Sequence, residues 1–429
     1  MKTTFLITAM AGAALGAPHL HARADPPSTN ESIPLRSLGE LSIHRPGFLA
    51  SIPHAGSESL FISTFQLLGG DSVWRVDNLA ELVEAGSIAD APTSKIGGSI
   101  TWPNDATPVP EEIFGSEGII VGGGFLVPGK GNGGLFFSPT GADGASGNWI
   151  KLGGTRANWF YHRVVFADID MDGDKELVTC RARVPIIGNR ETMLVYLKPE
   201  DPANPTGKWV ETEIGTGCDA LFTVVDINGD GIPEILTPSF FTSVFHLFTS
   251  SSQEAGFAAP ESVRKILIDD TIGAGFDVEY VDINNDGKKD LLVTNHQGKN
   301  ASPIPAVYAY EIPDDITNAS GYVRHTLADG FPVTQGGLNQ ASPGSPVAFH
   351  PTEASKSGPP YIALAGDAAQ IAYVLIPGAE EWEYETTVLI NCGCTVGALA
   401  VKDVDGDGNV EIFVPCYDNN RVAGFSFTS

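Results

Sequence analysis

Basic residues are scarce in this chain of 429 residues, which carries 25 Lys and Arg against 52 Asp and Glu and a net charge of −27. Nucleic acids and anionic membranes bind basic surfaces, so this balance argues against both as partners. It suits acidic extracellular media. It also requires that any anionic substrate meet a locally basic pocket.

Cysteine is also rare, and the common catalytic signatures are missing. No C-x-x-C pair occurs, and neither a GxSxG nor an HExxH motif is present. In a secreted chain, five cysteines predict two disulfides and one free thiol. The five are Cys180, Cys218, Cys392, Cys394 and Cys416.

Long apolar runs are lacking except at the N-terminus. There Lys2 precedes "FLITAMAGAALGA", and "ARA" (Ala22 to Ala24) has the small–x–small spacing of a cleavage site. Residues 1–24 are therefore predicted to be a secretory signal peptide, because the run is too short to span a bilayer. We expect a secreted, extracellular, soluble protein with one domain over residues 25–429. Glycosylation sequons fit this route and lie at Asn30, Asn300 and Asn318.

Glycine and proline are abundant, with 49 and 30 residues, which favours many turns over long helices. One acidic turn followed by a β-branched run occurs four times, starting at Asp168, Asp226, Asp282 and Asp403. The first three starts are almost evenly spaced. The fourth follows after about twice that interval, so one degenerate unit is expected between them. Residues 25–160 leave room for two more, which gives seven units.

Each unit reads as four short strands, and this period predicts an all-β fold, a seven-bladed β-propeller. A solenoid is the main alternative, but a polar capping repeat is absent. The last unit ends after its third strand, "RVAGFSF". We therefore expect "GELSIH" (Gly39 to His44) to add the fourth strand, which would close the ring and cover both free sheet edges.

The acidic turns have the spacing of a calcium loop. Asp or Asn stands at positions one, three and five, Gly at six and an acid at nine, so oxygen atoms converge on a hard cation. The loop is shorter than an EF-hand and lacks its twelfth-position Glu. Turns on separate blades cannot converge on one substrate, so we expect structural Ca²⁺. The predicted ligands are Asp168, Asp170, Asp172, Asp174, Glu176, Asp226, Asn228, Asp230, Glu234, Asp282, Asn284, Asp286, Asp290, Asp403, Asp405, Asp407 and Glu411.

The DxDxDGxxE turns, followed by "ELVT", "EILT" and "DLLVT", resemble integrin-type FG-GAP/VCBS-like repeats over nearly all of residues 25–429. The resemblance implies the propeller fold. That superfamily contains integrin heads, propeller lectins and carbohydrate-active enzymes. Among secreted fungal members the chain looks most like the L-rhamnose-α-1,4-D-glucuronate lyases, with the aldos-2-ulose dehydratases as neighbours.

A propeller usually binds its ligand in a funnel at one end of the axis. With the acidic turns on one rim, the opposite rim comes from residues before the first strand and after the second strand of each unit. Aligning the units gathers histidine, arginine and tyrosine there, with carboxylates at Asp219, Asp367 and Asp418. The predicted site consists of His44, Arg45, Tyr161, His162, Arg181, Arg183, Asn295, His296, Gln297, Tyr417 and Asp418.

This composition suits a uronic acid. β-Elimination at a 4-linked uronide removes the C5 proton, whose acidity rises when Arg side chains neutralise the carboxylate. We expect His162 or His44 as base, Tyr161 or His296 as acid, and a guanidinium group on the carboxylate. The arginines are Arg45, Arg181 and Arg183, and further substrate contacts are assigned to Asn295, Gln297, Tyr417 and Asp418. A metal held by His44, His162 and His296 is an additional candidate cofactor.

The predicted function is a monomeric lyase acting on plant or microbial acidic polysaccharide, such as the rhamnosyl-glucuronate ends of gum arabic. A non-catalytic propeller lectin is one alternative, although the rim residues differ between blades, which favours a single axial site. A keto-sugar dehydratase is another. A glycosidase is disfavoured, because this rim offers few of the paired carboxylates that hydrolysis uses.

Overall fold

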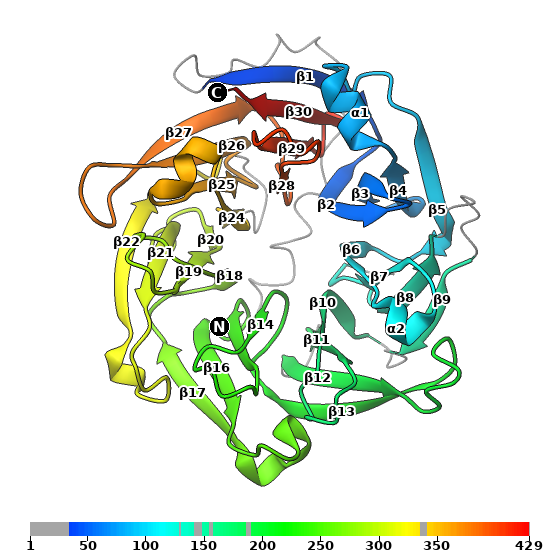
Figure 1. The fold of residues 1–429 in the computed structure, drawn as a ribbon, viewed down its shortest axis with the longest axis vertical. Coiled ribbons are helices and arrows are strands. Elements are labelled where there is room, and N and C mark those ends of the chain that lie inside the picture. Colours follow the sequence, from blue (N-terminus) through cyan, green and yellow to red (C-terminus); the bar gives the residue numbers. More distant parts are fainter. Residues whose placement is uncertain are drawn as a thin grey trace.

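The computed structural model describes residues 34–127, 130–140, 148–153, 158–185, 190–334 and 341–428. It shows seven four-stranded antiparallel sheets around one axis, with the first strand of each blade nearest the axis (Figure 1). The predicted seven-bladed propeller is confirmed. The predicted signal peptide and the sequon at Asn30 lie outside the described residues, whereas Asn300 and Asn318 are exposed.

The strands follow one another in chain order from the axis outward. Blade 1 consists of β2 (Pro46–His54), β3 (Ser57–Thr64), β4 (Asp71–Val76) and β5 (Thr93–Ile100), and blade 2 of β6 (Pro103–Pro108), β7 (Gly118–Gly123), β8 (Gly134–Pro139) and β9 (Ile150–Gly153). Blade 3 consists of β10 (Phe160–Ala167), β11 (Glu176–Arg183), β12 (Glu191–Pro199) and β13 (Trp209–Thr216), and blade 4 of β14 (Thr223–Val225), β15 (Glu234–Ser239), β16 (Val244–Ser250) and β17 (Val263–Asp269).

Blade 5 consists of β18 (Gly275–Val281), β19 (Asp290–Asn295), β21 (Ala306–Glu311) and β22 (Val323–Asp329), and blade 6 of β24 (Pro346–Phe349), β25 (Tyr361–Ala365), β26 (Ile371–Pro377) and β27 (Tyr384–Asn391). The short strands β20 (Gln297–Gly298) and β23 (Ala341–Ser342) pair with each other. The helical turns within the described ranges are α1 (Leu79–Glu84), α2 (Glu111–Phe114), η2 (Gly256–Ala258), η3 (Pro260–Ser262), η4 (Ala319–Gly321) and η5 (Glu353–Ser357).

Blade 7 joins the two ends of the propeller. It consists of β28 (Ala400–Lys402), β29 (Glu411–Cys416), β30 (Arg421–Phe427) and, as its outer strand, β1 (Leu35–Ser42). The predicted closure is confirmed, although β1 begins and ends earlier than the predicted Gly39–His44. Figure 1 shows β1 lying beside β30.

Blades 7 and 1 also meet close to the axis. The backbone N–H of Leu49 donates to Ala398 O at 3.2 Å. A Cβ at Gly397 would lie 1.8 Å from Gly47 O, so only glycine permits this close approach.

The hydrophobic core lies in the seams between neighbouring blades. One seam packs Ile120 and Leu135 of blade 2 against Leu177 and Val195 of blade 3, all fully buried. The second strand β11 is buried along nearly its whole length, whereas the outer strand β13 is mostly partly buried or exposed. Within the described ranges, no helix is long and apolar enough to cross a membrane.

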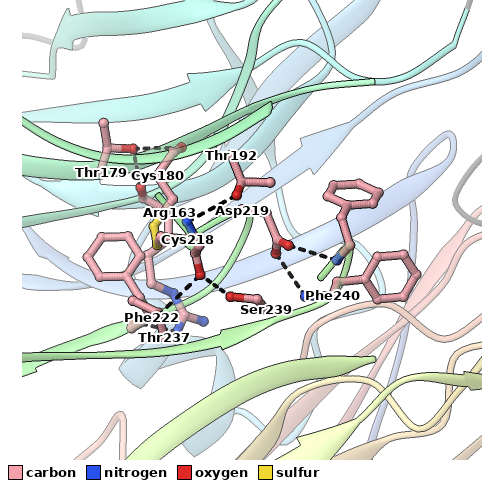
Figure 2. Close-up of a disulfide and its surroundings, with 12 residues drawn as sticks. Arg163, Thr179, Cys180, Thr192, Cys218, Asp219, Phe222, Thr237, Ser239 and Phe240 are labelled. Atoms are coloured by element: carbon pink, nitrogen blue, oxygen red, sulfur yellow. Dashed lines mark hydrogen bonds between the residues drawn. A yellow bond between two sulfur atoms is a disulfide. The ribbon is translucent and has the colours of Figure 1, made fainter. Parts of the chain in front are cut away.

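Two disulfides link neighbouring blades, as the cysteine count predicts. Cys180 on β11 bonds to Cys218, which precedes blade 4 (Figure 2). Cys392, just after β27, bonds to Cys416 at the end of β29, and Cys394 remains a buried free thiol.

Shortening Leu38 in the closing strand should loosen the ring. Its side chain is fully buried in the seam with Phe413 and Val422. We expect Leu38→Ala to lower the free energy of unfolding by about 2–5 kcal/mol. The measurement is denaturant unfolding beside Leu68→Ala, whose side chain is 85% exposed and should change stability by about 0.5 kcal/mol or less. Equal small effects would show that β1 is dispensable.

Candidate functional site

A cavity of about 90 Å³ lies on the axis at the rim opposite the acidic turns. Its walls come from the starts of first strands and the ends of second strands, where the sequence places the candidate site. The lining residues are Gly47, Phe48, Phe65, Trp102, Asn104, Phe125, His162, Phe276, His296, Asp367, Thr395, Gly397 and Tyr417.

His296 is buried and fixed in one tautomer. Its Nδ1 lies 2.7 Å from Pro343 O, an acceptor only, so Nδ1 carries the proton and Nε2 keeps its lone pair. Nε2 lies 3.5 Å from Asp367 Oδ2. Burial lowers the pKa of His296 to about 4, so the ring is neutral in mildly acidic media.

Asp367 faces His296 from the end of β25 and is held rigidly. Its backbone is left-handed (φ 46°) and exchanges hydrogen bonds with Val396 of blade 7, at 3.1 and 3.3 Å. Such strained positions cluster at functional sites. Burial and the nearby charge of Asp418 raise the pKa of Asp367 to about 7. The carboxyl group therefore keeps its proton below neutral pH.

His162 lines the same cavity from β10. Its Nδ1 is buried without a hydrogen bond and lies 3.9 Å from Asp105 Oδ1, which leaves Nε2 as the nitrogen available to a ligand. Burial holds the pKa of His162 below its usual range. The cavity thus contains two neutral imidazoles and one carboxyl group that can hold a proton, as general acid–base catalysis requires.

An ion-pair network lies next to the cavity, one residue further along the inner strands. Arg163 donates to Asp277 at 2.6 and 2.9 Å and to Asp105 at 3.0 Å, which ties blades 2, 3 and 5 together across the axis. Each of these residues directly follows a cavity residue, namely Asn104, His162 and Phe276.

Bulges in the innermost strands explain this arrangement. Strand register shifts between Pro103 and Ala106, between Tyr161 and Val164, and between Gly275 and Val278. A bulge lets two consecutive side chains face the same side, whereas regular strands alternate. In each of these strands, one side chain can therefore line the cavity while the next one joins the ion-pair network.

Aromatic rings form the cavity wall contributed by blades 1 and 2. Phe65 and Trp102 stack with centroids 4.6 Å apart, and Trp102 stacks on Phe125 at 4.9 Å. Phe48 meets the His162 ring edge-on at 5.0 Å. Such rings offer flat apolar surface to a ligand.

Two buried polar atoms in the cavity wall have no hydrogen-bond partner. Asn104 donates from Nδ2 to Tyr161 O at 2.7 Å, which turns Oδ1 away from that carbonyl and leaves it unbonded. Thr395 Oγ1 is also unbonded. Such atoms are costly unless water or a ligand meets them. Both atoms are buried behind the cavity surface.

Arg45, Tyr417 and Asp418 lie together beside the cavity, as predicted. Arg45 pairs with Asp418, and its guanidinium lies 5.0 Å from the ring centroid of Tyr417. The Tyr417 hydroxyl donates to Phe65 O at 2.7 Å, so its ring, rather than its hydroxyl, is offered to a ligand.

Four other predicted residues lie elsewhere, which corrects their expected convergence. His44 is exposed, with Nε2 3.0 Å from Gln66 Oε1. Tyr161 is buried in the seam between blades 2 and 3. Arg181 is buried between Glu211 (3.1 Å) and Glu213 (2.6 Å) of the outer strand, and Arg183 pairs with Glu191. Both guanidinium groups lie over the Trp159 ring. They brace blade 3.

Three further residues, Asn295, Gln297 and Asp219, do not line the cavity. They belong to or bind backbone segments near it. Asn295 Nδ2 donates to Ile272 O at 2.9 Å, and Gln297 belongs to β20. Asp219 accepts the N–H groups of Phe240 and Phe241 at 3.1 and 2.8 Å (Figure 2). Burial raises its pKa to about 7.

The acidic turns adopt one repeated geometry. The first Asp of each accepts the N–H of the residue five positions later, at 2.9–3.0 Å, for example from Gly173 to Asp168. The ninth-position acid accepts the N–H of the second residue, also at 2.9–3.0 Å. In two turns, carboxylate oxygens gather within 4.8 Å of one another. Oxygen donors at this spacing fit a hard cation. The two sets are Asp168, Asp170 and Glu176, and Asp403, Asp405 and Glu411.

His44 does not join His162 and His296 at the cavity, where a metal held by all three was expected. Among the described residues, the groups of carboxylates and thiols close enough to share an ion contain no histidine. His44 points to Gln66, while His296 is engaged with Pro343. Of the three histidines predicted as ligands, His162 and His296 line the cavity and His44 does not.

Removing the ion pairs of Arg163 with Asp277 and Asp105 should destabilise the fold. Arg163→Met leaves the Asp277 carboxylate, whose side chain is 3% exposed, without its partner. We expect the free energy of unfolding to fall by about 3–5 kcal/mol. The control, Lys208→Met, removes a pair with Glu200 that is mostly exposed and should cost about 0–1 kcal/mol. Matching losses in denaturant unfolding would contradict a buried, desolvated network.

Comparison with known proteins gives structural likeness only. No family model matches the chain, and no curated protein matches it. A provisionally named 6-phosphogluconolactonase from Bacteroides fragilis is 14% identical, with 84% of this chain and 95% of that chain covered and a TM-score of 0.46. A second provisionally named 6-phosphogluconolactonase, from Bacteroides uniformis, is 12% identical, with 81% and 87% covered and a TM-score of 0.44.

Proposed function

We propose that the axial cavity is the active site of a secreted polysaccharide lyase that breaks a 4-linked glucuronate glycan by β-elimination. The observation that carries the proposal is one cavity that combines an aromatic wall, neutral imidazoles and a carboxyl group that can hold a proton. Aromatic faces suit a sugar ring, and neutral imidazoles suit proton transfer.

His162 is assigned as the base and Asp367 as the acid. His162 Nε2 takes the C5 proton, the C4–O bond breaks, and a C4=C5 double bond forms. The Asp367 proton passes to the leaving oxygen, with His296 Nε2 positioned to share it. Arg45 is the guanidinium that can approach the uronate carboxylate, provided that its contact with Asp418 loosens. This assignment replaces Tyr161, Arg181 and Arg183.

A keto-sugar dehydratase is the second candidate. One observation favours it: the residues lining the cavity include neither lysine nor arginine. A neutral keto-sugar needs no cationic partner, and water is lost through the same proton transfers. Structural Ca²⁺ in acidic turns such as that of blade 7, and glycosylation at Asn300 and Asn318, belong to both versions of the proposal.

The deciding experiment offers gum arabic, a rhamnosyl-glucuronate disaccharide and a neutral keto-hexose to the purified protein. Formation of an unsaturated uronate, followed by its ultraviolet absorbance, is expected from the first two. Conversion of the keto-hexose alone would establish the dehydratase. Tight glycan binding without turnover of any substrate would instead show a lectin.

Replacing either cavity histidine should abolish most turnover. We expect His162→Asn and His296→Asn each to lower kcat by about 10²–10⁴-fold, the usual share of a general acid or base. The control is His350→Asn on the acidic-turn rim, where Nδ1 meets Ser355 O at 3.1 Å. Initial rates on the disaccharide decide the matter. Wild-type rates in both cavity variants would show that the cavity is not the active site.

Asp367 should set the alkaline limb of the pH profile. The acid must hold its proton, so kcat/KM should fall as pH rises through about 7. In Asp367→Asn this limb should disappear along with most activity. Because the charge of Asp418 raises the pKa of Asp367, Asp418→Asn should move the limb to lower pH. An unmoved limb in both variants would assign the ionisation to another group.

A further inference from the structure

The four acidic turns differ at one position, the third-strand residue beside the ninth-position acid. Lys198 occupies it in blade 3 and contacts Glu176. In blade 4, Thr249 Oγ1 donates to Glu234 Oε1 at 3.0 Å. In blade 7, Ser426 pairs with Glu411 in strand register. In blade 5, the register of Leu291 with Tyr310 places Glu311 next to Asp290. The residue at this position is thus positively charged in blade 3, neutral in blades 4 and 7, and negatively charged in blade 5.

Lys198 enters the carboxylate cluster of blade 3. Its Nζ lies 2.7 Å from Asp170 Oδ2 and 3.3 Å from Glu176 Oε1, and it also contacts Asp172. Asp170 and Glu176 are two of the three residues whose oxygens gather in this turn. The ammonium therefore lies among the oxygens that would bind a cation.

The blade 7 turn contains the same oxygens without such a cation. Glu411 is fully buried, its Oε2 accepts the Val404 N–H at 3.0 Å, and its Oε1 has no hydrogen bond. Asp403 and Asp405 place oxygens within 4.8 Å of it. A buried carboxylate oxygen directed into an acidic cluster calls for an external cation.

A divalent ion and the Lys198 ammonium exclude each other in blade 3. Calcium coordinates oxygen at about 2.3–2.6 Å, so an ion bound to Asp170 and Glu176 would lie close to Nζ, and the two cations would repel. Because Lys198 belongs to the chain, its ammonium group is always close to these carboxylates and loses no translational entropy on binding. It therefore competes well with a calcium ion from solution. Asp168 Oδ1, Asp170 Oδ1 and Glu176 Oε1 have no hydrogen bond, so blade 3 differs from blade 7 in the ion pairs that Lys198 makes and not in the number of unbonded oxygens.

We propose that Lys198 is a built-in cation that keeps the blade 3 turn free of calcium at concentrations that fill the blade 7 turn. The blade 3 turn joins β10, which carries His162 and Arg163, to β11. The strand that carries the proposed base is thereby anchored without metal. Calcium removal should then loosen blade 7 while it spares blade 3. This inference is independent of the proposed reaction.

Reciprocal variants test it. Lys198→Ser gives blade 3 the residue found in blade 7, and Ser426→Lys does the reverse. Bound calcium per chain is measured on the full-length protein by calcium titration and by elemental analysis after dialysis. Relative to the wild type, we expect about one more calcium in Lys198→Ser and about one fewer in Ser426→Lys. Circular dichroism confirms folding, and Lys198→Gln repeats the first test if Lys198→Ser fails to fold.

Hydrogen exchange supplies a second readout in the wild type. With a chelator, exchange should accelerate in residues 403–411 and stay unchanged in residues 168–176. Unchanged calcium content in a folded Lys198 variant would overturn the proposal, as would equal acceleration in both turns. A wild type that binds no calcium would also overturn it, because the proposal assigns an ion to the blade 7 turn.

Discussion

The cavity side of this propeller depends on the ion pairs that Arg163 makes with Asp277 and Asp105. A propeller leaves a channel on its axis, and here one guanidinium and two carboxylates join three blades across it. The bulges in β6, β10 and β18 make this possible, because they direct consecutive side chains to the axis. The cavity residues Asn104, His162 and Phe276 are thereby held beside the network, each next to one of its members.

The two rims have separate tasks because of strand direction. In every blade the first strand runs from the cavity rim to the acidic rim, so the turn after it always lies far from the cavity. Carboxylates that gather in these turns can stabilise blades but cannot reach a ligand at the other end. The residues after second strands, such as His296 and Asp367, return to the cavity rim. The repeated acidic turns therefore stabilise the blades on one rim, whereas residues that differ from blade to blade form the candidate site on the other.

The sequence predicted the ring, its seven units and its closing strand, because these follow from spacing and from a missing fourth strand. It also placed His162, His296 and Tyr417 at one rim. It failed for Arg181, because nothing in "CRAR" shows which face of β11 meets the axis, and that side chain turns into the blade against Glu213. Phe65, Trp102 and Asn104 were missed because blades 1 and 2 lack the acidic turn by which units were aligned. Their only signal was aromatic and amide residues next to predicted strand ends.

Charge inside the cavity differs sharply from charge on the protein. The chain carries a net charge of −27, yet burial keeps His296 unprotonated and Asp367 protonated, so the empty cavity is close to neutral. A uronate that enters would add a negative charge between these groups. That charge would stabilise an imidazolium and raise the pKa of both imidazoles, which makes each a stronger base. It would also raise the pKa of Asp367, which secures the proton needed by the leaving oxygen. An anionic substrate would thus prepare both proton-transfer groups, whereas a neutral keto-sugar would have to react with the weak base that burial alone leaves.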